Sequence, residues 1–391
     1  MAQIGKISPA LAEEARNVAM AELVKYLDLY GEATIAFNCQ DGYAAARPLA
    51  VLAMAHLFRR VELGGAQAEE DLDRATTLLE VLADSYLAGE WGKTSWLSSL
   101  PVLNMGVAAQ IGWPDFSPGL RNKISLVIKS EADYVAGLPP LSNVSAHQSA
   151  DCSVSPLDVS CDSKSEENAA MANLLSFAAS FYGHLNPRGN WLVKSKTFAY
   201  HSLTTPTDSP YGGYRTLTIF PDGSIGNHNI FPNIHYMLAT SVLAAESVLF
   251  SSINDEVPTE YIRNSELVWD AARENINIQH FSYNNFKSDY SNDSPLWFPS
   301  AFAYATVVLG EDEALVASLL KEKAMTDYVA IPDSKKPTTV GYYDPEFFTN
   351  SNVLKRYLIT WLLFANQAQG VNEVKIVPLI RQAEQETSAG G

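Results

Sequence analysis

Apolar residues recur three and four positions apart through about a dozen segments of the chain, whereas the strict alternation that marks strands is scarce. In the segment 230–252, for example, Ile234, Leu238 and Val242 fall on one face of a helix. The spacing predicts helices over roughly 9–30, 45–63, 67–88, 97–111, 117–136, 165–184, 187–200, 230–252, 258–276, 296–309, 311–325 and 350–369. The chain is therefore expected to be all-α.

Long polar stretches separate these segments, at 137–164, 201–229, 278–295 and 326–349. Loops of this length in a compact domain are usually functional or disordered. With 391 residues, of which 47% are hydrophobic, the chain can bury a large core, and no shift in composition marks a domain boundary. We expect one α/α-toroid domain over 1–391, a complete or incomplete ring of helical hairpins with a cleft at its concave end, and a partly disordered tail over 371–391.

The charge of the chain restricts its partners. The formal net charge is −17 and no run rich in Lys or Arg occurs, which argues against an electrostatic hold on nucleic acid or on an anionic membrane. No apolar run reaches the length of a membrane span, and no signal-peptide layout is present, so we expect a cytoplasmic protein, or a secreted one if a signal has been removed. Cys152 and Cys161 could pair only in an exported protein. The expected partner is a small molecule or an oligosaccharide, and an anionic one has to be met by a few local cations.

The first group of candidate site residues lies in "DSKSEENAAMAN", where a helix is predicted to begin. Asp162 and Glu166 are about one helical turn apart and could hold a divalent cation such as Mg²⁺ or Ca²⁺, while Glu167 and Asn168 could hold a sugar substrate. A structural alternative stays open, because Ser163 and Glu166 fit the spacing of a helix-capping box. Capping explains neither Glu167 nor Asn168, which carries a propensity cost inside a helix.

The second group lies in "DGSIGNHNIFPNIHY", directly before and within the first turn of another predicted helix. Asn227, His228 and Asn229 follow glycines that allow a tight turn, and His235 and Tyr236 follow in the helix itself. A His titrates near neutral pH, an Asn donates to an oxyanion without adding charge, and a Tyr can transfer a proton. Together they suit proton abstraction beside a carboxylate, although each one alone has a structural alternative as a cap or a core residue. We expect the two groups to face each other across one hollow.

Two arginines with neighbouring tyrosines complete the candidates. In "SPYGGYRTL", Tyr214 is a candidate catalytic group and Arg215 a candidate carboxylate holder, since a guanidinium binds carboxylates with two prongs. A surface salt bridge is the structural alternative for Arg215. In "NVLKRYLITW", Arg356 and Tyr357 either face the same cavity or cover the core.

The segments "DSKSEEN" and "GNHNIFPNIHY" resemble motifs of toroidal proteins related to heparinase II/III-like and alginate-type polysaccharide lyases, in which an Asn-His element begins an inner helix. The likeness covers about residues 160–240. It implies a carbon–oxygen lyase that cleaves an acidic, uronate-containing carbohydrate by β-elimination and requires no cofactor. The roles that it implies are Asn227 or Asn168 as neutraliser of the uronate carboxylate, His228 or His235 as base, Tyr236 or Tyr214 as proton donor, and Arg215 as carboxylate holder.

Two other functions fit the same sequence. A Mg²⁺-dependent terpene cyclase of the class I type would use Asp162, Glu166 and Asn229 to hold the cation against a prenyl diphosphate, although an ordinary DDxxD motif is absent. A non-catalytic toroid would bind carbohydrate through loop aromatics, among them Trp91, Trp96, Tyr211, Trp297, Tyr342 and Tyr343. The fold alone does not decide among these functions.

Overall fold

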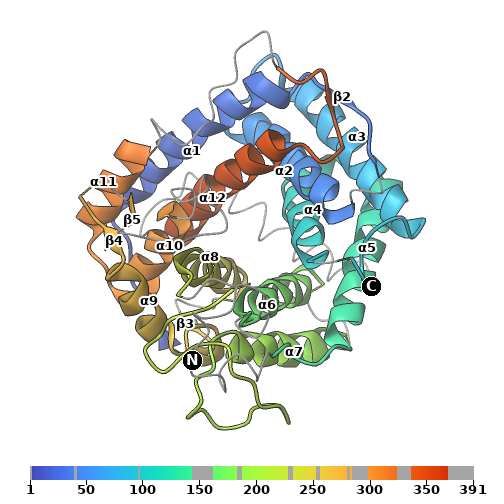
Figure 1. Cartoon of the computed structure of the whole chain (residues 1–391). Coiled ribbons are helices and arrows are strands. Elements are labelled where there is room, and N and C mark those ends of the chain that lie inside the picture. Colours follow the sequence, from blue (N-terminus) through green and yellow to red (C-terminus); the bar gives the residue numbers. More distant parts are fainter. Residues whose placement is uncertain are drawn as a thin grey trace.

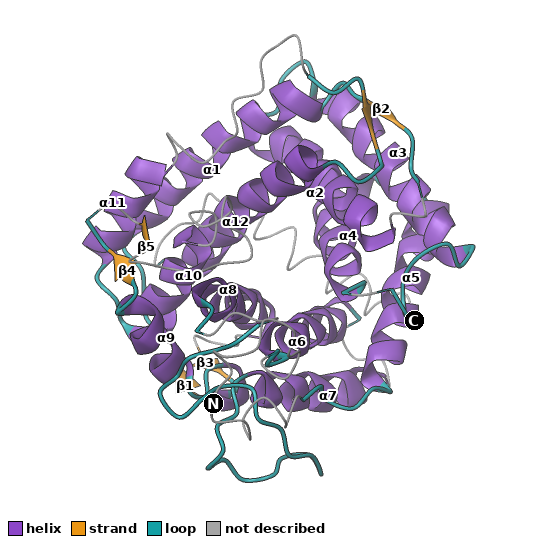
Figure 2. Cartoon of the chain, viewed as in Figure 1, coloured by secondary structure: helices purple, strands orange, loops and turns teal. Residues whose placement is uncertain are grey.

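The computed structural model of the protein describes residues 2–38, 42–95, 97–142, 162–182, 187–227, 232–251, 256–279, 282–283, 298–323 and 336–368. Twelve α-helices and six strands of two residues each occur in these ranges, which confirms the prediction of an all-α protein (Figure 2). The helices are α1 (Pro9–Tyr30), α2 (Gly42–Glu62), α3 (Ala68–Leu87), α4 (Ser99–Gly112), α5 (Pro118–Ala136), α6 (Ser165–Phe181), α7 (Pro187–Ser202), α8 (Ile234–Ser251), α9 (Ser265–Arg273), α10 (Phe298–Tyr304), α11 (Glu313–Lys323) and α12 (Pro345–Gln367).

Local capping explains where the structure departs from the predicted helix ends. The helix α12 begins at Pro345 rather than near 350, because Asp344 accepts a hydrogen bond from the Phe347 N–H at 2.8 Å and a proline suits the first helical position. The segment predicted as one helix over 258–276 is divided into a 3₁₀ turn and α9, since Asn264 between them adopts a left-handed conformation with φ 53°.

The strands form three short ladders between segments that are distant in the sequence. The antiparallel pairs are β1 (Ala2–Gln3) with β3 (Glu256–Val257) and β4 (Ile276–Asn277) with β5 (Ser282–Tyr283). The parallel pair is β2 (Thr34–Ile35) with β6 (Thr339–Val340), which brings the segment before α2 next to the segment before α12.

Consecutive helices alternate between an inner and an outer layer (Figure 1). The inner layer contains α2, α4, α6, α8, α10 and α12, and each of these helices packs against the next, with α12 packing against α2. The outer layer contains α1, α3, α5, α7, α9 and α11. Side chains on the inner helices therefore meet in the interior although they are far apart in the chain.

The inner helices α6 and α8 run in the same direction. The Ser165 hydroxyl at the start of α6 lies 3.0 Å from the Thr240 hydroxyl near the start of α8. Further along both helices, the Asn173 amide donates to Glu246 at 3.1 Å. Because the residue numbers rise together on both helices, their first turns lie at the same end of the molecule.

The inner helices α2 and α12 are also parallel. The Arg47 guanidinium lies 5.4 Å from the centre of the Phe348 ring, and the Phe58 and Trp361 rings meet edge to face with 5.5 Å between their centres. These contacts fix the position of Arg47 against the first turn of α12.

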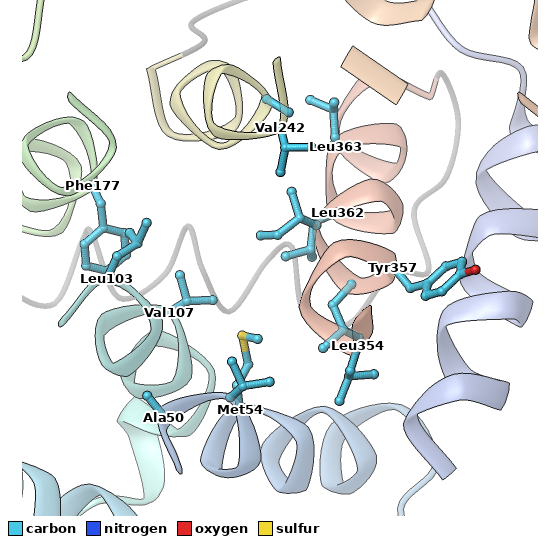
Figure 3. Packing of buried hydrophobic residues seen from close by; sticks show 14 of the residues in the cluster. Ala50, Met54, Leu103, Val107, Phe177, Val242, Leu354, Tyr357, Leu362 and Leu363 are labelled. Atoms are coloured by element: carbon cyan, nitrogen blue, oxygen red, sulfur yellow. The ribbon is translucent and has the colours of Figure 1, made fainter. Parts of the chain in front are cut away.

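One continuous cluster of buried apolar side chains extends through the helices. In Figure 3, Met54 of α2, Val107 of α4 and Leu362 of α12 point toward the interior, whereas Tyr357 points toward α1. Tyr357 is 1% exposed, so of the two alternatives for this residue the structure supports the core.

The helix α8 is the only one in the described ranges that is long and apolar enough to cross a membrane by length and composition, and 89% of its apolar window is buried inside the protein. Burial of this extent is the property of a core helix. The tail predicted over 371–391 lies outside the described residues.

Candidate functional site

One lysine binds the acidic segment at the start of α6. Lys164 precedes the helix in a left-handed conformation with φ 60°. The capping-box interpretation of Ser163 and Glu166 is wrong, because the Ser163 N–H donates to the Gly226 carbonyl and the Ser163 hydroxyl accepts from the Ser165 N–H. The Lys164 ammonium binds Glu167 at 2.9 Å and also binds Asp162. Burial raises the pKa of Glu167, although attraction to Lys164 opposes this shift. Asp162 and Glu167 therefore share one cation.

The divalent cation predicted at Asp162 and Glu166 has no assembled set of ligands in the described ranges. Within them, no group of three His, Cys, Asp or Glu side chains is arranged to hold a metal ion. Lys164 also binds the Asp162 carboxylate. A site for Mg²⁺ or Ca²⁺ at these two carboxylates stays a prediction.

The two groups of candidate residues lie next to each other at the starts of α6 and α8. The Ser163 N–H donates to the Gly226 carbonyl at 3.1 Å. The Ser165 hydroxyl lies 3.0 Å from the Thr240 hydroxyl. The acidic segment therefore contacts both the turn before α8 and the helix itself. The two groups are neighbours, and the hollow expected between them stays a prediction.

The described residues of the second group are buried at this junction. Asn227, His235 and Tyr236 are 2%, 1% and 7% exposed. His235 and Tyr236 lie in the first turn of α8, as predicted. His228 and Asn229 lie outside the described residues. The catalytic and binding roles of these five residues stay predictions.

The side-chain amide of Asn168 is fully used within the fold. Its Oδ1 accepts from the Leu141 N–H at 2.8 Å, and its Nδ2 donates to the carbonyls of Leu141 at 2.8 Å and His201 at 3.2 Å. The residue is completely buried. Asn168 therefore joins α6 to the end of α7 and to the segment after α5, and this contact replaces the predicted role in substrate binding.

Tyr214 and Arg215 lie on the loop that follows α7. The Tyr214 ring lies 5.5 Å from the ammonium of Lys194, a residue of the outer helix α7. Arg215 is exposed and donates to the Pro206 carbonyl at 3.3 Å. The predicted catalytic role of Tyr214 and the predicted carboxylate-holding role of Arg215 do not fit this position, because the turn that carries both residues packs against the outer helix α7.

Five charged side chains of the inner helices form what we call the central charge cluster: Arg47 of α2, Glu166 of α6, Glu246 of α8, and Lys355 and Arg356 of α12. Lys355 and Glu246 form an ion pair with 2.8 Å between Nζ and Oε1, and their side chains are 6% and 3% exposed. Ion pairs buried this deeply are costly, because both charges lose their hydration.

Glu166 is the most accessible member of the central charge cluster, since its exposure is intermediate and the other four side chains are buried. Burial and the neighbouring charges of Glu167 and Asp162 raise the pKa of Glu166 to about 7, although Arg47 and Arg356 oppose the shift. A carboxyl group with this pKa can donate or accept a proton near neutral pH. Perturbed pKa values of this kind gather at functional sites.

Lys355 experiences repulsion as well as attraction. The pKa of Lys355 is lowered to about 8, chiefly by burial and also by repulsion from Arg47 and Arg356, although attraction to Glu246 opposes the shift. Among the described residues, the cluster therefore contains three cations and two carboxylates, one of which is only partly ionised at neutral pH. Such an arrangement can hold an anion and transfer a proton beside it.

Only Glu166 and Arg356 of this cluster are among the residues that the sequence motifs single out. Arg47 and Glu246 each stand alone in apolar stretches, "GYAAARPLAVLAMA" and "SVLAAESVLF", and Lys355 precedes Arg356 in another. A charge inside an apolar helix has to be buried with a partner. That pattern is the sequence feature by which these residues can be found.

No protein-family model matches the chain, and neither the curated proteins nor the solved structures yield a significant match.

Proposed function

We propose that the chain is a carbon–oxygen lyase of the α/α-toroid type, which binds an acidic, uronate-containing carbohydrate at the central charge cluster and cleaves it by β-elimination. One observation carries the proposal: two buried cations, Arg47 and Arg356, lie near Glu166, a carboxyl group whose pKa is about 7. The same two arginines lie near a third buried cation, Lys355, which is paired with Glu246. In a chain with a net charge of −17, local cations are required to attract an anion. The closed series of inner helices supports the toroid.

In the proposed reaction, Arg47 and Arg356 hold the uronate carboxylate through charge-assisted hydrogen bonds. Their charge stabilises the enolate-like anion that forms when the proton on C5 is removed. The electron pair of the C5–H bond becomes the C4–C5 double bond, the bond from C4 to the glycosidic oxygen breaks, and that oxygen takes up a proton. The products are an unsaturated uronate and a free hydroxyl group.

The reaction needs one group that removes a proton and one that delivers a proton. Glu166 suits one of these transfers, because a pKa of about 7 keeps both of its forms populated at neutral pH. Tyr236, in the first turn of α8 next to the start of α6, is the proposed group for the other transfer. His235 is the alternative on the same turn.

The test follows the ultraviolet absorbance of the unsaturated product while the protein acts on uronate polymers. We expect Glu166→Gln to lower kcat/KM by about 10²- to 10⁴-fold, the usual range for losing an acid–base group. We expect Arg356→Lys to lower kcat/KM by about 10²- to 10³-fold, the usual cost of losing one group that stabilises the developing anion. Lysine in place of Arg356 keeps the charge and loses the two-pronged geometry. Arg215→Gln is the matched control, since Arg215 is exposed on the outer loop. Full activity in both cluster variants, or a comparable loss in the control, contradicts the proposal.

A terpene cyclase is the second candidate, and one observation favours it. Apolar side chains, among them Met54 and Leu362, point toward the interior from helices that also carry the cations (Figure 3). A prenyl chain could occupy such surroundings while its diphosphate meets Arg47 and Arg356. Farnesyl diphosphate with Mg²⁺ would then give an isoprenoid product by gas chromatography, EDTA would abolish it, and uronate polymers would remain intact. Binding of oligouronates without turnover would instead indicate a non-catalytic carbohydrate-binding protein.

A further inference from the structure

A cavity with a mixed polar and apolar lining lies beside the first turn of α6, between this turn, α5 and the segment before α4. Its volume is about 230 Å³. Lys164 and Glu167 form part of its lining, and they flank Glu166 in the sequence. The cavity therefore adjoins the central charge cluster through the start of α6.

The backbone around this cavity is strained. Four residues other than glycine have positive φ in the described ranges, and three of them line the cavity: Lys93 at 44°, Leu97 at 51° and Lys164 at 60°. The fourth is Asn264, and asparagine adopts this conformation readily. Glycine would adopt it without strain at the other three positions. Backbone strain of this kind is common at ligand sites, so residues other than glycine at these three positions indicate that the cavity binds a ligand.

Glu131 fixes the loop that carries Lys93 and Leu97. Its Oε2 accepts from the Tyr86 hydroxyl and from the Lys93 N–H, both at 2.8 Å, and its Oε1 accepts from the Ser98 hydroxyl. The carboxylate is completely buried. A buried carboxylate satisfied by three donors holds its partners rigidly, so this wall of the cavity is formed before any ligand arrives.

The lining of the cavity has no net charge and many hydroxyl groups. Lys93 and Lys164 balance Glu131 and Glu167. The other side chains with hydroxyl groups are Thr94, Ser95, Ser98, Ser99 and Tyr134, and the remaining lining is apolar. A sugar ring matches such a wall, since its hydroxyl groups can bond to polar side chains while its C–H faces pack on apolar ones. The volume of about 230 Å³ lies below the roughly 300–1,000 Å³ of sites for drug-sized ligands and suits one monosaccharide unit.

We infer that this cavity is a subsite for an uncharged sugar unit adjacent to the uronate at the central charge cluster, an inference that rests on the proposed function. Each unit of a polymer made only of uronates would bring a carboxylate into a cavity whose cations are already balanced. The protein therefore prefers carbohydrates in which uronates alternate with uncharged sugars.

The test compares hyaluronan oligosaccharides, in which uronates alternate with uncharged sugars, with alginate oligosaccharides, in which every unit is charged. We expect kcat/KM of the wild type to be at least tenfold higher on the hyaluronan series. Met171→Trp, which fills the cavity from α6, raises KM on hyaluronan at least tenfold and leaves KM on alginate unchanged. Leu126→Trp is the matched control, because Leu126 is exposed on α5 and lies outside the cavity lining.

Lys93→Gly separates binding from folding. The substitution relieves the positive φ of Lys93, so the midpoint of urea denaturation stays the same or rises, while KM on hyaluronan rises. A lower midpoint with unchanged KM means that Lys93 serves the fold alone and overturns its part in the subsite.

The outcomes distinguish the two proposals. If the wild type cleaves uronate polymers but Met171→Trp matches it on both series, the subsite is refuted and the lyase proposal stands. If no polymer is cleaved, the lyase proposal fails, and calorimetric titration with hyaluronan oligosaccharides then shows whether the cavity binds a sugar. Binding that Met171→Trp removes and Arg47→Lys retains supports the subsite, whereas no binding by the wild type overturns it.

Discussion

Lys355→Met tests whether the interior cations serve binding or only stability, because the two explanations predict opposite signs. If Lys355 serves only as the partner of Glu246, its loss leaves a buried carboxylate uncompensated and costs about 3–5 kcal/mol. If Lys355 is part of a cationic site, its loss also relieves the repulsion between Lys355 and the two arginines, Arg47 and Arg356.

The magnitude follows from the pKa of Lys355. The fold lowers this pKa from 10.5 to about 8, so the charged form is disfavoured. One pKa unit corresponds to about 1.4 kcal/mol, and the charged form therefore costs about 3 kcal/mol relative to the neutral form. Lost packing and the remaining charge on Glu246 offset part of the gain. We expect Lys355→Met to raise the free energy of unfolding by about 1–2 kcal/mol at pH 7 and to weaken binding of oligouronates at the same time.

The pH dependence has a defined sign. The penalty from charged Lys355 is present in full below pH 8 and disappears as the pH rises through 10.5, so the wild type recovers stability in that window and the variant does not. The advantage of Lys355→Met therefore shrinks by about 2 kcal/mol between pH 7 and pH 9.5. Urea denaturation at both pH values measures this change. Lys123→Met, which removes an exposed ion pair, is the control and should leave the denaturation midpoint close to that of the wild type at both pH values. A loss of 3 kcal/mol or more at pH 7 refutes the reasoning.

Three further predictions concern stability. Because the pKa of Glu166 is raised to about 7, the wild type loses stability as the pH rises from 4.5 to 7, and Glu166→Gln removes that loss. Since Glu166 is partly exposed, we expect the stability of the variant relative to the wild type to be about 1 kcal/mol greater at pH 8 than at pH 4, as measured by urea denaturation. Asn168→Leu removes three hydrogen bonds and should lower the free energy of unfolding by about 2–3 kcal/mol, and an unchanged denaturation midpoint would disprove the bridging role. Gly106→Ala places a methyl group 2.2 Å from the Phe177 ring and should lower the free energy of unfolding by about 1–3 kcal/mol, measured by thermal unfolding. Gly119→Ala, in open surroundings, should raise it by about 0.5–1 kcal/mol. Equal effects of the two substitutions would contradict the packing argument.

The helices were predictable because the spacing of apolar residues in each segment indicates which face of the helix is buried. The stripe on 230–252 reports the burial of α8, and the predicted span of 117–136 nearly coincides with α5, whose start is set by Ser117 and Pro118. Departures occur where a single residue outweighs periodicity, as at Asn264, whose left-handed conformation no apolar pattern encodes.

The candidate site was predictable only in part, because motif spacing reports neighbours in the chain and the site is built across helices. The contact between the starts of α6 and α8 follows from two local motifs. The meeting of Arg47 with Lys355 depends on how α2 packs against α12, and nothing in either segment states that packing. Arg215 shows the reverse error, since its chemistry is suitable and its loop lies over the outer layer.

A charged residue in an otherwise apolar helix indicates a buried polar site that the spacing of motifs does not reveal. Burying Arg47, Lys355 and Arg356 together is costly, because each cation loses hydration and repels the others. Apolar residues of similar volume would avoid that cost, and replacing buried charges in this way often stabilises proteins. Glu166, only partly ionised near pH 7, leaves the cluster with more positive than negative charge among the described residues. An anion that enters the interior would remove this repulsion and stabilise the protein. We therefore expect an oligouronate to raise the melting temperature of the wild type, for the same reason that Lys355→Met raises its free energy of unfolding.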